Sequence, residues 1–182
     1  MESKMIFAGF GGQGVLLAGQ LIAEAGMQNG KNVTWMPAYG PEMRGGSANC
    51  SVVVSQSLIG TPIILNPDLL VAMNKPSLEL FGPKVVAGGC IIYNSSLIDT
   101  PPARDDVTII PIPCNEIAQE LGQPKVVNMP ILGAVIQATK SVTIEDLEKA
   151  MNEKFGEAKK KMIETNLVAI NKGLEICQKV VK

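Results

Sequence analysis

Histidine is absent from this chain of 182 residues. Its absence excludes a Ser-His-Asp triad, a histidine-ligated metal and a histidine general base. The four cysteines, Cys50, Cys90, Cys114 and Cys177, are far apart and form no C-x-x-C pair. We therefore expect no iron–sulfur cluster or zinc ribbon held by this chain alone, and the simpler interpretation is buried free thiols in a reducing compartment.

Charge is also scarce, since only 18% of the residues are charged, 46% are hydrophobic and the formal net charge is −1. This balance gives no general attraction to nucleic acid or to an anionic membrane. No apolar run approaches the roughly 20 residues of a membrane helix, and the first residues lack the pattern of a signal peptide. We expect a cytoplasmic protein with one domain over residues 1–182 and no nucleic-acid or membrane partner.

Apolar and helix-like segments alternate along the chain. Strands are predicted at residues 4–8, 33–36, 49–55, 68–73, 89–93, 107–112 and 125–127, with a short hairpin-like return at 58–65. Helices are predicted at residues 15–29, 76–81, 114–121, 130–138, 144–155 and 157–181. This order favours the α/β class, with a mainly parallel or mixed sheet flanked by helices and a helical C-terminal tail.

A glycine-rich loop, with Gly9, Gly11 and Gly14 in the pattern G-x-G-x-x-G, joins the first strand to the first helix. Such a loop brings backbone N–H groups close to an anion at the start of the helix. The alternative is that the glycines only let the helix pack closely on the sheet. A P-loop needs Lys and Ser/Thr where the chain has Val15 and Leu16, so a phosphoryl-transfer site is not expected.

Ordinary NAD binding is not expected either, because no acidic residue stands at the end of the second predicted strand. Polar residues follow the later predicted strands, at positions 74–75, 94–96 and 128. If these strands are parallel, their polar ends share one edge with the glycine loop and suit a phosphate- or amide-rich ligand. Ordinary turn and cap residues remain the alternative at each position.

Two stretches together resemble one known family: G-F-G-G-Q-G-V at residues 9–15 and Y-G-P-E-M-R-G-G at residues 39–46. In this order they resemble the gamma subunit of 2-oxoacid:ferredoxin oxidoreductases, equivalent to the gamma-type domain of pyruvate:ferredoxin oxidoreductase. The resemblance continues through Asn128 and the segment 132–134, and covers nearly the whole chain.

The resemblance implies a subunit of an enzyme that oxidatively decarboxylates a 2-oxoacid to acyl-coenzyme A and reduces ferredoxin. The isolated chain is expected to be inactive and to contribute to subunit assembly and to the coenzyme A site. Thiamine diphosphate, Mg²⁺ and [4Fe–4S] clusters are expected only on partner subunits. The expected partners are the alpha and beta subunits of the same enzyme, with a ferredoxin-like delta subunit and a homodimer left open. The alternative is a nucleotide-binding or structural module of another oxidoreductase complex, without a catalytic role.

Guided by this resemblance, we expect the phosphate-facing loop to comprise Gly11, Gly12, Gln13 and Gly14. Arg44 is the candidate for a charge-assisted contact, either to coenzyme A or across a subunit interface. Its alternative role is an ion pair with Glu42 or with a partner carboxylate. Asn128 is the candidate for the pantetheine amides or the adenine of coenzyme A. No catalytic residue and no metal ligand are expected in this chain.

Overall fold

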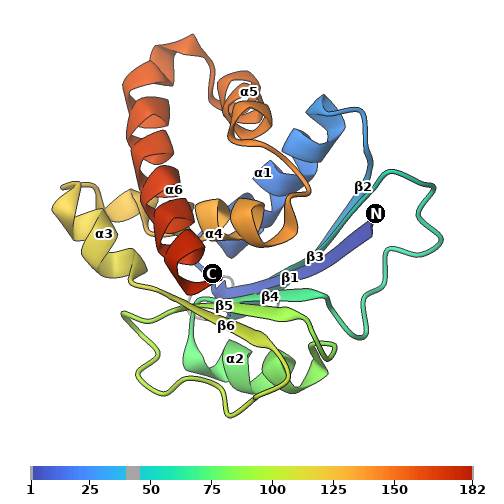
Figure 1. Cartoon of the computed structure of the whole chain (residues 1–182). Coiled ribbons are helices and arrows are strands. Elements are labelled where there is room, and N and C mark those ends of the chain that lie inside the picture. Colours follow the sequence, from blue (N-terminus) through green and yellow to red (C-terminus); the bar gives the residue numbers. More distant parts are fainter. Residues whose placement is uncertain (1, 40–45, 182) are drawn as a thin grey trace.

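The computed structural model describes residues 2–39 and 46–181. They form a six-stranded sheet with helices on both faces (Figure 1). The strands are β1 (Glu2–Phe10), β2 (Asn32–Tyr39), β3 (Ser47–Ser55), β4 (Leu69–Ala72), β5 (Cys90–Asn94) and β6 (Thr108–Ile112). The helices are α1 (Val15–Gln28), α2 (Lys75–Phe81), α3 (Cys114–Glu120), α4 (Met129–Thr139), α5 (Ile144–Phe155) and α6 (Lys160–Val180), with short 3-10 turns η1 (Gly82–Lys84), η2 (Pro124–Val126) and η3 (Glu157–Lys159).

The sheet is mixed, with the strand order β2-β3-β1-β4-β5-β6. Strands β1, β4, β5 and β6 run parallel, whereas β3 is antiparallel to both of its neighbours, β1 and β2. The chain passes from β1 through α1 to β2 and β3 on one side, and then crosses to β4 on the other side. The carboxyl ends of β1 and β4 therefore form the switch point of the sheet, where ligands bind in many open α/β folds.

Each face of the sheet has its own hydrophobic core. Met5 and Phe7 of β1 belong to the cluster formed with residues of α1, α4, α5 and α6, whereas Ile6 and Ala8 belong to a second cluster with α2. The two groups of helices lie on opposite faces of the sheet (Figure 1). All four side chains are at most 3% exposed. This double burial explains why the central strands are almost continuously apolar, and it confirms the predicted α/β class.

Helix α1 packs closely on β3 because small residues line its inner face. The predicted apolar stripe of α1 is buried, with Val15, Ala18, Ile22 and Ala25 at most 2% exposed. A Cβ atom added at Gly19 would lie 2.4 Å from the Sγ atom of Cys50. The start of α1, and with it the glycine loop, is therefore held tightly against the sheet.

The four cysteines are free thiols, as predicted. Cys50, Cys114 and Cys177 are buried, and Cys90 is half-buried. Burial raises the pKa of the Cys50 and Cys90 thiols to about 12. These side chains behave as small apolar core residues.

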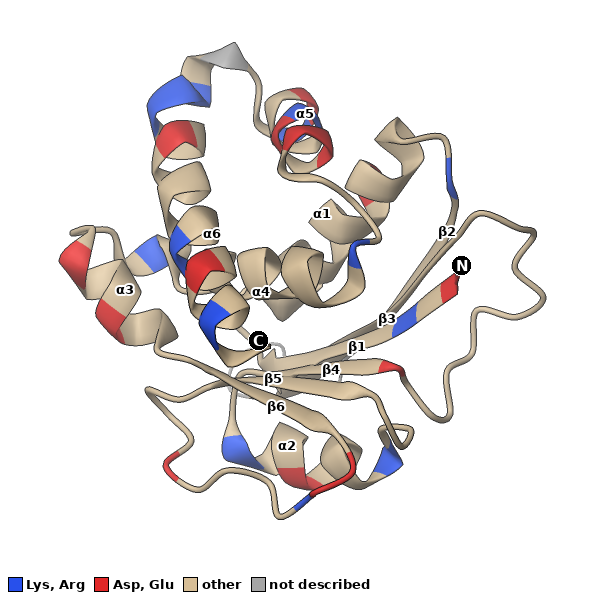
Figure 2. Cartoon of the chain, viewed as in Figure 1, with Lys and Arg blue, Asp and Glu red and all other residues tan. Residues whose placement is uncertain are grey.

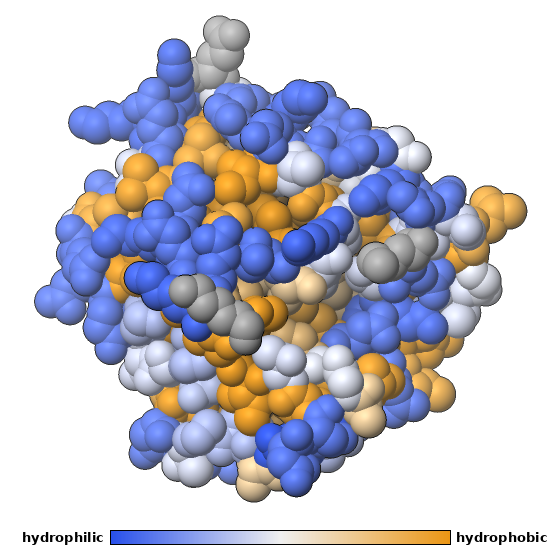
Figure 3. Space-filling model, in the orientation of Figure 1, coloured by the Kyte–Doolittle hydropathy of each residue, from blue (hydrophilic) through white to orange (hydrophobic). Residues whose placement is uncertain are grey.

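Two predicted elements are wrong. Residues 58–65 form an irregular loop, because Gly60 and Pro62 cannot sustain a strand ladder. Apolar side chains of this loop are at least 63% exposed at Leu58, Ile63 and Leu65, and hydrophobic surface protrudes at the right edge of the molecule, where the loop lies (Figure 3).

The second wrong element is the predicted strand at residues 125–127. Pro124 starts the 3-10 turn η2, and the chain runs from this turn directly into α4. A two-valine run is too short for periodicity to separate a strand from a turn. Asn128 therefore stands at the N-terminus of α4 and does not follow a strand.

The tail forms helices as expected, and a capping box begins α5. The Thr143 hydroxyl accepts the Asp146 N–H at 3.1 Å, and the Asp146 carboxylate accepts the Thr143 N–H at 3.0 Å. The Nδ2 atom of Asn29 also donates to this carboxylate at 2.7 Å, which ties the end of α1 to the start of α5. Charges of both signs are interspersed over the helices (Figure 2), and no helix of the described residues has the length and apolarity to cross a bilayer.

Helices α4 and α6 cross with their backbones in contact. A Cβ atom added at Gly133 would lie 1.8 Å from the carbonyl oxygen of Ile170, and one added at Gly173 would lie 1.8 Å from that of Pro130. Only glycine fits at these two positions without moving a helix. This crossing fixes α4, and so it also fixes Asn128 at the start of α4.

We predict that Gly133→Ala destabilises the fold by about 3 kcal/mol, the upper end of ordinary overpacking costs. The added methyl group must push α6 away, and this loss exceeds the gain of about 1 kcal/mol in helix propensity. Urea unfolding monitored by circular dichroism measures the change. Gly60→Ala is the control, because no atom lies within 4 Å of its Cβ position. Equal unfolding midpoints for the two variants would contradict the close crossing.

Candidate anion-binding site at the glycine loop

The loop between β1 and α1 needs glycine at two of its positions. Gly12 has φ +99° and Gly14 has φ +74°, both in the left-handed region that side chains disfavour. Gly14 is also the N-cap of α1 and has no side-chain hydrogen bond that caps the helix. The first turn of α1 therefore begins with backbone donors that the N-cap residue does not satisfy.

The side chain of Gln13 turns back into the protein and joins two strands. Its Oε1 atom accepts the Phe10 N–H at 2.7 Å, and its Nε2 atom donates to the carbonyl oxygen of Met73 at 3.0 Å. Phe10 ends β1, and Met73 follows β4. The Gln13 amide thus fills the space between the carboxyl ends of these strands, at the switch point of the sheet.

Asn74 continues this network on the β4 side. Its Nδ2 atom donates to the Gln13 Oε1 atom at 3.2 Å, and its Oδ1 atom accepts the Ser77 N–H at 2.9 Å. The same side chain therefore caps α2 and supports Gln13. It is only 4% exposed, so its role is to position the loop from within the protein.

Asn128 holds the other end of the loop. Its Nδ2 atom donates to the carbonyl oxygen of Gly14 at 3.1 Å. A Cβ atom on Gly14 would lie 2.5 Å from that same nitrogen. Gly14 is thus required both for its positive φ and for the close approach of Asn128, whose side chain is 4% exposed.

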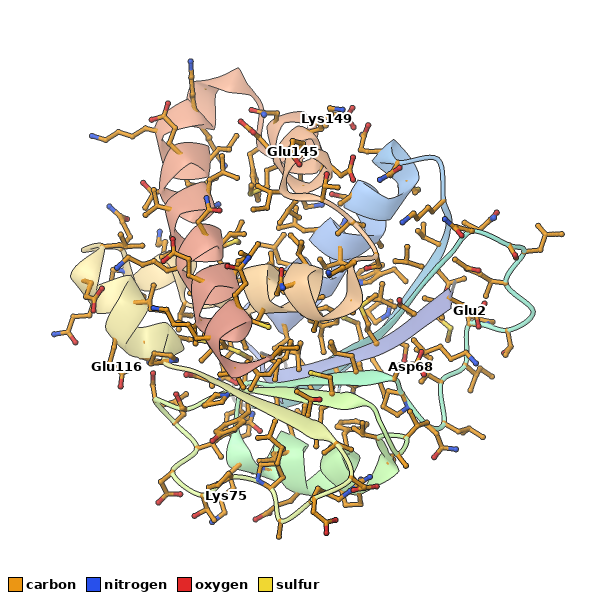
Figure 4. The ribbon with its side chains drawn as sticks, in the orientation of Figure 1. Glu2, Asp68, Lys75, Glu116, Glu145 and Lys149 are labelled. Atoms are coloured by element: carbon orange, nitrogen blue, oxygen red, sulfur yellow. The ribbon has the colours of Figure 1, made fainter. Side chains whose placement is uncertain are left out.

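The remaining residues predicted at this edge lie elsewhere. Asn94 is fully buried and donates to the Asn115 Oδ1 atom at 2.9 Å, so it belongs to the junction of β5 with α3. Lys75 lies with α2 on the opposite face of the sheet (Figure 4) and lines a separate cavity with Pro101 and Arg104. The structure therefore brings Asn74 and Asn128 to the loop, but not Asn94 or Lys75.

Some backbone N–H groups of the loop are already used within the protein. Gly11 donates to the carbonyl oxygen of Gly46 at 2.9 Å, and Gln13 donates to that of Phe10 at 3.1 Å. By contrast, the N–H groups of Gly12, Gly14 and residues 15–17 have no partner among the described residues. Free donors at a helix N-terminus, together with the helix dipole, favour an anion.

These free donors belong to residues that line a cavity of about 520 Å³. Its walls are the loop, the first turn of α1 and residues 46–48 at the start of β3. The first turn of α1 contains no acidic side chain that would repel an anion. The cavity therefore offers donors and suitable electrostatics for a phosphate or carboxylate group.

Arg44, the predicted charged contact, lies outside the described residues. Within the described residues, no group of three or more His, Cys, Asp or Glu side chains is placed to hold a metal ion. Arg104 donates to the carboxylate of Asp106 and to the carbonyl oxygens of Gly82 and Val85, just after the end of α2.

Residues 4–176 match the protein family described as pyruvate ferredoxin/flavodoxin oxidoreductase. This chain belongs to that family. The family membership confirms the resemblance stated from the sequence, which likewise covers nearly the whole chain.

Curated relatives of this family domain occur in proteins of different length. The 2-oxoglutarate synthase subunit KorC of Methanocaldococcus jannaschii is 32% identical over 99% of this chain and 96% of that protein. The ketoisovalerate oxidoreductase subunit VorA of Methanothermobacter marburgensis is 36% identical over 98% of this chain but only 37% of that protein. The chain thus spans little more than a third of the length of the VorA relatives it matches.

Solved structures share the fold of this family domain. The gamma subunit of a keto/oxoacid ferredoxin oxidoreductase from Geobacter sulfurreducens superposes with a TM-score of 0.81 and 29% identity, over 97% of this chain and 99% of that chain. The 2-oxoglutarate:ferredoxin oxidoreductase of Magnetococcus marinus, solved with 2-oxoglutarate, coenzyme A and succinyl-CoA bound, gives a TM-score of 0.88 and 26% identity, over 98% of this chain and 31% of that chain.

We predict that Gln13→Ala lowers the stability of the family domain by about 2 kcal/mol, since three hydrogen bonds of about 0.5–1.5 kcal/mol each are lost. For a domain of this size, that loss corresponds to a fall in melting temperature of about 4–8 °C. Differential scanning calorimetry measures it. Gln119→Ala is the control, because Gln119 is exposed on α3 and makes no side-chain hydrogen bond within the described residues. A melting temperature unchanged by Gln13→Ala would refute the bridging role.

Proposed function

We propose that this chain is the gamma-type subunit of a 2-oxoacid:ferredoxin oxidoreductase. The observation that carries the proposal is the family match over residues 4–176, joined to a preformed set of free backbone donors beside a cavity. Support also comes from relatives of nearly the same length, whose names describe subunits of 2-oxoglutarate synthase.

In this proposal, the assembled enzyme decarboxylates a 2-oxoacid, transfers the acyl group to coenzyme A and passes electrons to ferredoxin. In this proposal, thiamine diphosphate, Mg²⁺ and [4Fe–4S] clusters lie on the partner subunits: alpha, beta and any ferredoxin-like delta subunit of the assembly. The contribution of this chain is to assemble with those subunits and to hold part of coenzyme A.

The glycine loop is the proposed contact with coenzyme A. The residues present fit a phosphate, because Gly12, Gly14 and the first turn of α1 have free N–H groups and line the same cavity. Gln13 and Asn128 are not proposed to touch the phosphate. Their side-chain hydrogen bonds hold the two ends of the loop in this conformation. Arg44 remains the proposed cationic contact, either with coenzyme A or with a partner subunit.

The choice of 2-oxoacid is proposed to lie outside this chain. Relatives over the same residues carry names that specify ketoisovalerate, 2-oxoglutarate or pyruvate. Domains of this one family thus occur in enzymes named for three different 2-oxoacids. The groups that select the substrate are therefore expected near thiamine diphosphate, on the partner chains.

An affinity-tagged copy of the full chain, purified anaerobically from its own cells, tests this proposal. We expect thiamine-dependent and iron–sulfur chains to co-purify in fixed ratio, with 2-oxoacid- and coenzyme A-dependent reduction of ferredoxin. In the same preparation, Gly12→Asp should raise the KM for coenzyme A about 10- to 100-fold, because a charge-assisted contact of about 1.5–3 kcal/mol is replaced by repulsion. The KM for the 2-oxoacid should not change.

Two controls separate charge from strain. Gly12→Ala carries the same positive-φ strain as Gly12→Asp but no charge, so it should lower the coenzyme A affinity less than Gly12→Asp does. Gly88→Asp places a charge at φ +77°, in open space outside the loop cavity, and should not affect coenzyme A. A chain that purifies alone would overturn the subunit assignment, whereas an active complex with a normal KM in Gly12→Asp would overturn only the role of the loop.

A further inference from the structure

The loop between β3 and β4, residues 56–67, carries the most exposed apolar side chains of the described residues. Leu58 is 89% exposed, Leu65 75% and Ile63 63%, and no other large hydrophobic side chain of the described residues exceeds 57%. This loop contains no charged residue. Single exposed leucines are ordinary, but a group of them without charges is typical of a surface that binds another protein.

The loop has a defined shape because part of it packs on the protein. Ile64 is half-buried against the core on the α2 side of the sheet, whereas its neighbours Ile63 and Leu65 are exposed. Two hydrogen bonds of 2.8 Å hold the end of the loop to β1: the Asp68 N–H donates to the carbonyl oxygen of Lys4, and the Lys4 N–H donates to the Asp68 carboxylate. An ordered loop loses little conformational entropy when it binds, so its exposed side chains are preorganised for contact.

The loop projects from the edge of the molecule, where its apolar surface stands out in Figure 3. Charged groups lie at its base: Lys4 pairs with Glu2 at 3.5 Å, and Figure 4 shows Glu2 and Asp68 on this side of the molecule. An apolar centre with a polar rim is the usual arrangement of a protein interface. A projecting surface of this kind is complementary to a concave one.

A second copy of this chain fits the loop poorly. A stable interface buries about 1,200–2,000 Å² in total and uses roughly 20–30 residues on each side. Two copies that met through this loop would touch tip to tip, and residues 56–67 are too few for such an interface. A groove in a different chain would instead surround the loop and bury its exposed side chains, as the central anchors of an interface are buried.

The lengths of the relatives also favour a partner within the same assembly. In VorA of Methanothermobacter marburgensis and in the Magnetococcus marinus enzyme, the matched domain makes up 37% and 31% of a longer chain, so the rest of that polypeptide is attached to it. In KorC of Methanocaldococcus jannaschii the match covers 96% of the protein. A separate chain has only surface contacts to hold it to its partners, and burial of apolar side chains is the main driving force for such contacts.

We infer that residues 56–67 dock in an apolar groove of a partner subunit, with Leu58, Ile63 and Leu65 as the buried anchors. The inference rests on the proposed function, since the partner is a subunit of the proposed oxidoreductase. The groove is concave, has no charge at its centre and is lined by aliphatic or aromatic side chains. An aspartate at any of the three positions would lose its water there without gaining a partner, and so would weaken docking.

Quantitative mass spectrometry of the complex tests the inference. An affinity-tagged copy of the full chain is produced in its own cells beside the untagged chain and purified anaerobically. We expect Leu58→Asp and Ile63→Asp each to lower the amount of thiamine-dependent and iron–sulfur subunits recovered per tagged chain about tenfold or more. Leu80→Asp is the matched control, because Leu80 is 57% exposed on α2 and takes the same charge; it should recover these subunits as the wild type does.

A photocrosslinker in place of Leu58 identifies the occupant directly and does not depend on those variants. With p-benzoylphenylalanine at this position, we expect a crosslink to a peptide of a partner subunit in the purified complex. A crosslink to a second copy of this chain, or no crosslink in an intact complex, would overturn the inference. Wild-type recovery of the subunits with Leu58→Asp and Ile63→Asp would do the same but leave the subunit assignment standing. If the wild-type chain purifies alone, the proposed function fails, and the inference fails with it.

Discussion

The hydrogen bonds of the Gln13 amide join the ends of β1 and β4 and hold the glycine loop, the proposed anion site, against the sheet. In an open α/β sheet, the crevice between such strands is the usual ligand position. Here a protein amide fills that crevice. The free N–H groups instead border a cavity on the other side of β1, against the start of β3. The domain has the glycine pattern of a dinucleotide-binding fold. Its free backbone N–H groups, however, face the start of β3 and not the crevice between β1 and β4.

Contacts with α4 and with the start of α2 hold the glycine loop in its conformation. The contact between Gly133 and the backbone of α6 fixes α4, and α4 places Asn128 against Gly14. Asn74 supports Gln13 while it caps α2. Two segments, at the start of α2 and at the start of α4, thus hold Gln13 and Gly14, so part of the entropy cost of ordering the loop is met by folding.

The sequence predicted most helices and strands, but not the side-chain contacts between segments that are distant in the chain. Alternating apolar segments identified the α/β class, and the glycine spacing located the loop, because both are local patterns. The Gln13 partner Met73 is 60 residues away, so its contact depends on strand order, which no local pattern encodes. The strand predicted at residues 125–127 was wrong for a related reason. The segment forms the 3-10 turn that leads into α4, and it pairs with no strand of the sheet. The same error placed Asn128 after a strand, although its proximity to the loop was predicted correctly.

The central claim is that Gly12, Gly14 and the first turn of α1 supply free donors to a phosphate. Backbone amide NMR of this 19.3 kDa chain during titration with coenzyme A tests it most directly. We expect the amide signals of Gly12, Gly14 and Leu16 to move, while those of Gly11 and Gln13, which already donate within the protein, move much less. Saturation with no movement of the Gly12 and Gly14 amides, or with the largest changes around α2 or α3, would contradict the account.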